Sequence, residues 1–177
     1  GALGWYMVQS GLVDRPDVSQ YRLAAHLGLA VLIYILLLRA ALGVFIPERF
    51  VVVGRSRGSP ARGSYLAVGF IFVTMLSGAL VAGLDAGLIY NTFPLMDGHW
   101  IPDGLLDQAP WFVNFGENIT MVQFAHRCFA LTTSVLVLAA WFRAALSRAI
   151  DIDPERRGSL DHWLGHALLL ALIAQLC

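Results

Sequence analysis

The stretch Ala82-Gly-Leu-Asp-Ala-Gly-Leu-Ile-Tyr-Asn-Thr-Phe-Pro-Leu-Met96 decides how this chain is organised. It starts where an apolar run ends and carries Asp85, Tyr90 and Asn91 into a loop. Further along, Glu117-Asn-Ile-Thr-Met-Val-Gln-Phe-Ala-His-Arg127 places a histidine and an arginine inside another apolar run. Ionisable side chains at membrane depth are costly and usually serve a function. The two blocks together indicate a membrane protein with a buried cofactor site.

The composition points to an integral membrane protein. Of the 177 residues, 58% are hydrophobic and only 14% are charged, whereas soluble domains have about 25% charged residues. The 12 basic residues, all arginine, balance 12 acidic ones, and no basic patch is interleaved with aromatic residues, which argues against nucleic-acid binding. Both cysteines lie in apolar runs without a Cys-x-x-Cys motif, which argues against a loop disulfide or a covalently attached haem.

Four apolar runs are candidates for membrane spans. They cover residues 23–43, 65–84, 119–141 and 160–177, and residues 1–8 resemble the tail of an earlier span. A bilayer core ~30 Å thick needs about 20 helical residues, a length that the first three runs reach. The expected fold is therefore all-α, a polytopic transmembrane helical bundle. No signal peptide is visible and the last run has no polar flank, so we expect an internal fragment of a longer protein.

The arginines predict the orientation of the spans. Residues 44–64 and 142–159 hold four arginines each, whereas residues 85–118 hold acidic side chains and neither Arg nor Lys. Short arginine-rich loops stay on the cytoplasmic or matrix side. Residues 1–22 and 85–118 are then outside, and the spans alternate in direction. The prolines, glycines and aromatic residues of 85–118 fit a lid on the membrane surface as well as an interfacial aromatic belt.

The predicted topology sorts the histidines into an outer and an inner pair. His26 lies near the outer end of the first span, and His126 lies roughly 10 Å deep in the third. An imidazole at this depth can ligate haem iron or bond to a neighbouring helix; the residues leave both open for His26 and favour ligation for His126. His162 and His166 are at the inner end of the fourth span, where their spacing would suit a metal but an interfacial position explains them better.

The charged residues near His126 allow two interpretations. Arg127 suits a carboxylate such as a haem propionate, because its guanidinium is a planar fork. Alternatively, Arg127 pairs with Glu117 or Asp85 in a structural network. Glu117 lies at the start of the third span, where the helix dipole favours a negative charge. Asp85 follows a helix C-terminus, where negative charge is disfavoured, so we expect Arg127 or a loop donor to compensate it.

Small residues follow one another on the second span. Such residues allow helices to approach closely, and they could equally make room for a flat macrocycle. They are Ser77, Gly78, Ala79, Ala82 and Gly83. Nucleophile-elbow, P-loop and dinucleotide motifs are not found in the sequence.

Four blocks in the sequence resemble haem A synthases of the mitochondrial and alphaproteobacterial type. They are Gly4-Trp-Tyr-Met-Val-Gln-Ser-Gly-Leu12, Tyr21-Arg-Leu-Ala-Ala-His26 and the two blocks quoted above, and they occur in the family's order. The resemblance implies an eight-helix protein with two similar four-helix halves, of which this chain holds helices four to seven. Residues 1–64 would be the remainder of the N-terminal half, and residues 65–177 the truncated C-terminal half.

The resemblance also implies a chemistry. The family oxidises the C8 methyl group of haem O to the formyl group of haem A, by successive hydroxylations and loss of water from a gem-diol. Each half has a histidine pair that faces a haem. His26 would ligate the iron of the substrate haem, and His126, with Arg127 beside it, that of a haem b. The partner histidines and the family's glutamate would lie outside these residues, and Gln123 is no base. The catalytic residue is therefore unknown, and we expect the fragment alone to be inactive.

The implied setting is cytochrome oxidase biogenesis in the bacterial or mitochondrial inner membrane. Haem O synthase and cytochrome oxidase assembly factors would be partners, the electron donor is unknown, and a homo-oligomer is left open. Two other functions remain open from the residues. One is a bis-histidine b-type membrane cytochrome for electron transfer, and the other is a haem-free membrane assembly protein.

Overall fold

The computed structural model of this chain describes residues 2–9, 18–45 and 60–150. Within these ranges the chain is helical, and the β pairing is limited to an isolated bridge between Met96 and His99. The elements are α1 (Ala2–Gln9), α2 (Gln20–Phe45), α4 (Pro60–Gly83), η1 (Ala86–Leu88), η2 (Trp111–Val113), α5 (Asn114–Glu117) and α6 (Ile119–Ile150). The expected all-α fold is confirmed.

Three of the helices are long and apolar enough to cross a membrane. They are Gln20–Phe45, Tyr65–Gly83 within α4 and Ile119–Arg143 within α6. These segments match the first three predicted spans, so the chain is a multi-pass membrane protein. The fourth predicted span, with His162 and His166, lies outside the described residues, as do most of the two arginine-rich loops.

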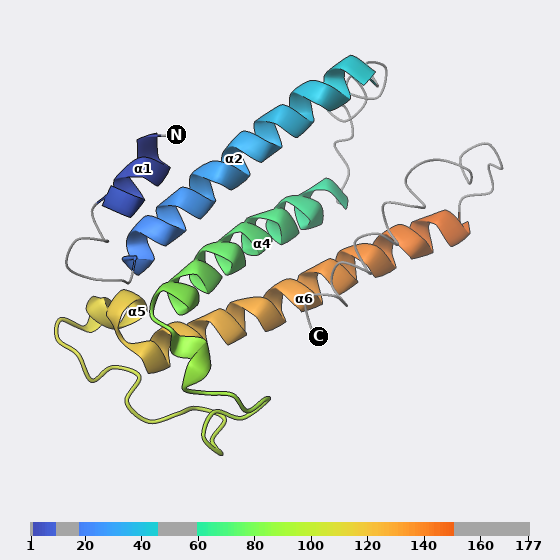
Figure 1. Cartoon of the computed structure of the whole chain (residues 1–177). Helices are drawn as coiled ribbons and strands as arrows, with labels where there is room; N and C mark the ends of the chain where they lie inside the picture. Colours follow the sequence, from blue (N-terminus) through green and yellow to red (C-terminus); the bar gives the residue numbers. More distant parts are fainter. Residues whose placement is uncertain (1, 10–17, 46–59, 151–177) are drawn as a thin grey trace.

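Helix α4 lies between α2 and α6, and it packs against both (Figure 1). The end of α2 and the start of α4 lie at one end of the bundle, and the end of α4 and the start of α6 lie at the other (Figure 1). The spans therefore alternate in direction, as predicted. Which end faces the outside remains a prediction from the arginines.

The interface between α4 and α6 contains buried apolar side chains and a hydrogen bond between two polar side chains. Ala67 and Val137 are buried in it. About two turns further along α4, the hydroxyl groups of Thr74 and Thr133 form a hydrogen bond of 2.8 Å between the two helices. Association of helices in lipid relies on such close packing and on hydrogen bonds between helices, because burying apolar surface gains little there.

Two buried asparagines hold the loop of residues 85–118 on the start of α6. The amide nitrogen of Asn114 donates to the carbonyls of Gln108 and Trp111. The Oδ1 of Asn118 accepts the backbone N–H groups of Thr120 and Met121 and so caps α6. Its Nδ2 donates to the Oδ1 of Asn114 at 3.0 Å, which ties the cap to the loop.

The start of α2 fits tightly between the loop and α4. The Nε2 of Gln20 donates to the carbonyl of Gly116 and to a carboxylate oxygen of Glu117, both at 3.1 Å. The hydroxyl of Tyr21 bonds to the same carboxylate. Gly83 approaches so closely that a Cβ atom there would be 2.5 Å from the Cα of Gln20. A side chain at Gly83 would therefore force α2 and α4 apart.

Candidate functional site

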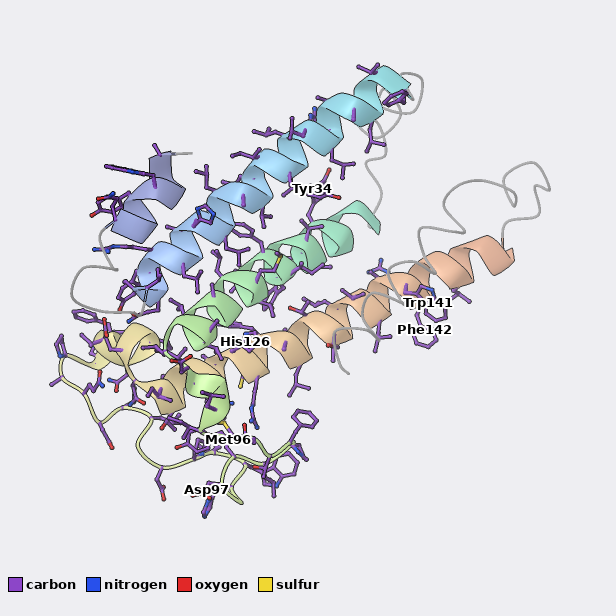
Figure 2. All side chains as sticks on the ribbon, viewed as in Figure 1. Tyr34, Met96, Asp97, His126, Trp141 and Phe142 are labelled. Atoms are coloured by element: carbon purple, nitrogen blue, oxygen red, sulfur yellow. The ribbon has the colours of Figure 1, made fainter. Side chains whose placement is uncertain are left out.

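An apolar pocket of about 510 Å³ lies at the meeting of α2, α4 and α6. Helix α2 contributes His26 to its lining, and α6 contributes His126. The α4 wall includes the small residues Gly78, Ala79 and Ala82, which the sequence had singled out. In Figure 2, His126 lies near the end of the bundle that carries Met96 and Asp97, whereas Trp141 and Phe142 lie toward the other end.

His126 is held against α4 by a hydrogen bond and a close contact. Its Nδ1 is 2.8 Å from the Oγ of Ser77. The same hydroxyl donates to the carbonyl of Thr74, also at 2.8 Å. A Cβ atom on Gly78 would be 3.1 Å from the Cε1 of His126, so a larger residue there would press on the ring. The small residues thus make room for an imidazole at this point.

His26 is half-buried on α2, with one edge of its ring facing α1. A Cβ atom on Gly4 would be 3.2 Å from the Cε1 of His26. The ring therefore lies between a glycine of α1 and the pocket. The resemblance assigns His26 and His126 to different haems, and the structure brings both to the lining of the same pocket. Which haem each one serves remains a prediction.

Arg127 binds the loop that follows α4. Its Nη1 donates to the carbonyls of Thr92 (2.7 Å) and Leu95 (3.2 Å), and its Nη2 donates to that of Tyr90 (2.8 Å). The Nε2 of Gln123 donates to the same Tyr90 carbonyl at 2.9 Å. The side chains of α6 therefore fix the backbone of the block quoted first.

Of the two interpretations of Arg127, the structural network with Glu117 or Asp85 is not found among the described residues. Arg127 donates to the backbone carbonyls above, and the carboxylate of Glu117 receives Gln20 and Tyr21 instead. Asp85 is exposed and adopts a left-handed backbone conformation, with φ at 50°, at the start of η1. Exposure explains why it needs no cation, because water solvates a carboxylate at the end of a helix.

Several residues that shape the site were not predicted from the sequence. Ser77 was noted for its small size, not for its hydroxyl, and Thr74 and Asn114 were not singled out at all. Asn118 carries a signal that could have been used, because asparagine is a preferred N-cap at the start of a helix. The role of Ser77 has no such local signal, since its partner is on another helix.

The residues of the pocket suit a haem. Its volume lies within the ~300–1,000 Å³ usual for cofactor and ligand sites. The walls are apolar apart from Thr74 and the two imidazoles, and imidazole nitrogen is a common axial ligand of haem iron. On the α4 wall, the absence of a side chain at Gly78 leaves room for the imidazole of His126 in the lining of the pocket. An apolar lining that carries imidazoles from α2 and α6 suits the chemistry of a haem.

Comparison with known proteins shows the family of this chain. Residues 1–177 match the COX15-CtaA family model, described as cytochrome oxidase assembly protein. The chain is 47% identical to the haem A synthase of Nitrosospira multiformis over 178 residues, which is 98% of this chain and 46% of that protein. It is 45% identical to the haem A synthase COX15 of Bos taurus and 44% identical to that of Homo sapiens, each over 88% of this chain and 38% of the relative.

The chain thus spans less than half the length of these curated relatives. No solved structure shows significant similarity to it. The match to the family model runs through every helix described above, including the pocket with His26 and His126 and the loop that Arg127 binds. On these grounds the chain belongs to the COX15-CtaA family of cytochrome oxidase assembly proteins.

Proposed function

We propose that this protein is a haem A synthase, an oxidoreductase that converts the C8 methyl group of haem O to the formyl group of haem A during cytochrome oxidase biogenesis. The names of its relatives support this activity. The observation that carries the proposal is the apolar pocket whose lining includes a histidine from α2 and a histidine from α6. A haem bound there would supply the redox-active iron that the oxidation needs.

The two histidines would hold haem iron through the imidazole. His26 is assigned to the haem O that is oxidised to haem A, and His126 to a haem b that stays bound. The Nδ1 of His126 is engaged by Ser77, so Nε2 is the nitrogen for the iron. The apolar side chains of α2 and α4 around them would exclude water from the macrocycle, which strengthens the interactions of the ligands.

Arg127 is assigned to a haem propionate. A guanidinium has five N–H donors. The bonds to Thr92, Leu95 and Tyr90 use both hydrogens of Nη1 and one of Nη2. With respect to the residues that the structure describes, the Nε hydrogen and the second Nη2 hydrogen are left for a carboxylate. Arg127 would then hold the loop and the cofactor together.

The division of the chain follows from the same family pattern. We propose that residues 1–64 belong to an N-terminal half and residues 65–177 to a C-terminal half, each with its own haem. His26 and His126 would each need a second histidine from elsewhere in the protein. For this reason, we expect the 177 residues produced by themselves to be inactive.

The proposed partners follow from the pathway in which the product is used. Haem O synthase would supply the substrate, and cytochrome oxidase assembly factors would receive the product. The membrane would be the bacterial or the mitochondrial inner membrane. The proposal names no electron donor, and it leaves open whether the protein forms a homo-oligomer.

The test is to produce the full-length protein in cells that make haem O and to identify the haems extracted from it. We expect haem A from the wild type and none from His26→Ala. His99→Ala is the matched control, because His99 is exposed in the loop and its Nδ1 bonds to the carbonyl of Asp97. Haem B alone in the wild type would indicate an electron-transfer cytochrome. Absence of haem, with no effect of His126→Ala, would indicate a haem-free assembly protein.

A further inference from the structure

We propose that Ser77 is a positioning residue for His126: its hydroxyl, backed by the carbonyl of Thr74, keeps the imidazole proton on Nδ1 and directs Nε2 to the iron. The inference rests on the proposed role of His126 as a haem ligand. It assigns to Ser77 a function that its size alone does not suggest.

The hydrogen bonds of Ser77 determine which nitrogen of the His126 ring carries the proton. The Oγ of Ser77 is 2.8 Å from the Thr74 carbonyl and 2.8 Å from the Nδ1 of His126. A hydroxyl has one hydrogen to donate, and a carbonyl oxygen can only accept. The hydrogen of Ser77 therefore goes to the carbonyl, and the lone pair of its oxygen receives a hydrogen from Nδ1.

The other tautomer would break this arrangement. If Nδ1 had no hydrogen, Ser77 would have to donate to it and give up its bond to Thr74. The hydrogen bond from Ser77 to Thr74 thus favours the tautomer with the hydrogen on Nδ1.

The second ring nitrogen is then available to a metal. In the part of the chain that the structure describes, the hydrogen bond of the His126 ring is made by Nδ1. The ring lines the pocket beside Met75 and Gly78, where the thioether of Met75 is at most a weak acceptor. A neutral imidazole with its proton on Nδ1 has its lone pair on Nε2, which is the form that ligates iron.

The neighbouring glycine restricts the rotation of the ring. The imidazole contacts two consecutive residues of α4, Ser77 and Gly78. A Cβ atom on Gly78 would be 3.1 Å from the Cε1 of the ring. A ligating histidine is usually oriented by the group that accepts its other N–H, and this bond also raises the basicity of the ligating nitrogen. Ser77 meets both requirements from within α4.

The basicity of the ligating nitrogen predicts the direction in which the midpoint potential of the haem changes. A more basic axial nitrogen stabilises ferric iron over ferrous iron. Loss of the Ser77 oxygen should therefore make the midpoint potential of the haem on His126 more positive. Loss of such a partner typically weakens metal binding by about 10–100-fold, so the same variant should retain less haem after dilution in detergent.

The experiment compares variants of the full-length, haem-loaded protein. Ser77→Ala removes the hydroxyl, and Ser77→Thr keeps it. Ser134→Ala is the matched control, because Ser134 is on α6 and donates to the carbonyl of Ala130 without contact to a histidine ring. Redox titration gives the midpoint potential, EPR reports the ligand field of the low-spin haem, and pyridine haemochrome spectra give the haem retained.

The proposal predicts a more positive potential, changed EPR g values and weaker retention for Ser77→Ala, with Ser77→Thr and Ser134→Ala close to the wild type. If Ser77→Ala does not accumulate, Ser77→Cys takes its place, since a thiol is a poor acceptor of similar size. An unchanged haem in Ser77→Ala or Ser77→Cys, together with loss of the haem in His126→Ala, would overturn the role of Ser77 and leave the proposed function intact. Full retention of the haem in His126→Ala would overturn both.

Discussion

The Nη2 of Arg127 donates to the carbonyl of Tyr90 at 2.8 Å, across 37 positions in the sequence. The bond joins the two blocks that stood out in the sequence, one at the end of α4 and the other at the start of α6. The hydroxyl of Tyr90 bonds in turn to that of Thr120, at 3.0 Å. The two blocks thus hold each other in place through hydrogen bonds.

Replacing Arg127 should release the loop while α6 stays folded. Arg127→Lys keeps the positive charge but loses the planar guanidinium, which donates to three carbonyls. Hydrogen bonds to charged groups contribute about 1.5–3 kcal/mol each. We expect faster amide hydrogen exchange in residues 90–96 and unchanged exchange in the middle of α6. Gln123→Ala removes a single bond to the loop and should have a smaller effect. Equal exchange in Arg127→Lys and the wild type would contradict this role.

Gly83→Ala should destabilise the protein, and Gly69→Ala should not. Both glycines are on α4, but a Cβ atom at Gly83 would be 2.5 Å from the Cα of Gln20, whereas that at Gly69 meets nothing within 4 Å. Alanine is favoured over glycine in helices by about 1 kcal/mol. Unfolding in mixed micelles should therefore show a loss of stability for the first variant and no change or a gain for the second. The same sign for both variants would rule out the close contact.

The bond between Thr74 and Thr133 should appear as a coupling between the two helices. Polar bonds between helices in membranes contribute on average about 0.6 kcal/mol and at most about 1.7 kcal/mol in double-mutant cycles. We expect a coupling in this range for Thr74→Val and Thr133→Val. The same cycle with Thr132→Val in place of Thr133→Val is the control, since Thr132 bonds within α6 to the Cys128 carbonyl. Strict additivity of the first pair would mean that the hydroxyls do not bond.

Asn118 makes two kinds of contact that can be separated. Asn118→Ala loses the cap of α6 and the bonds to the loop, whereas Asn118→Asp keeps an oxygen for Thr120 and Met121 and loses the donor to Gly104 and Asn114. A cap contributes about 0.5–2 kcal/mol. We expect Asn118→Ala to lower stability by at least this amount. Asn118→Asp should protect the first turn of α6 from exchange but not residues 104–114. Loss of protection in both regions would show that the cap depends on the loop.

The spans could be predicted because a membrane imposes a length and an apolar character that are visible in the sequence. The run 65–84 and the observed segment Tyr65–Gly83 differ by one residue. The bounds of these spans also placed His26 on the first span and His126 on the third, and the structure has them on α2 and α6. By contrast, the partners of Arg127 could not be predicted, because backbone carbonyls carry no signal in a sequence. The expectation for Asp85 failed because exposure depends on how the loop folds.

The pairing of Ser77 with His126 was out of reach for a related reason. The two residues are 49 positions apart and meet only once α4 and α6 have packed. The stripe of small residues predicted that something would approach α4 closely, but it gave two interpretations, a helix or a macrocycle. The structure contains a third: a side chain from the neighbouring helix occupies the space next to Gly78.

His126 and Arg127 are adjacent on α6, and consecutive residues of an α-helix project about 100° apart. One of them is held by Ser77 inside the bundle and the other by the loop outside it. A rotation of α6 about its own axis would therefore break both sets of bonds at once. The orientation of the imidazole therefore depends on Ser77 and on the loop that Arg127 binds. A ligand that moved the loop would also turn Nε2, the nitrogen that we propose for the iron.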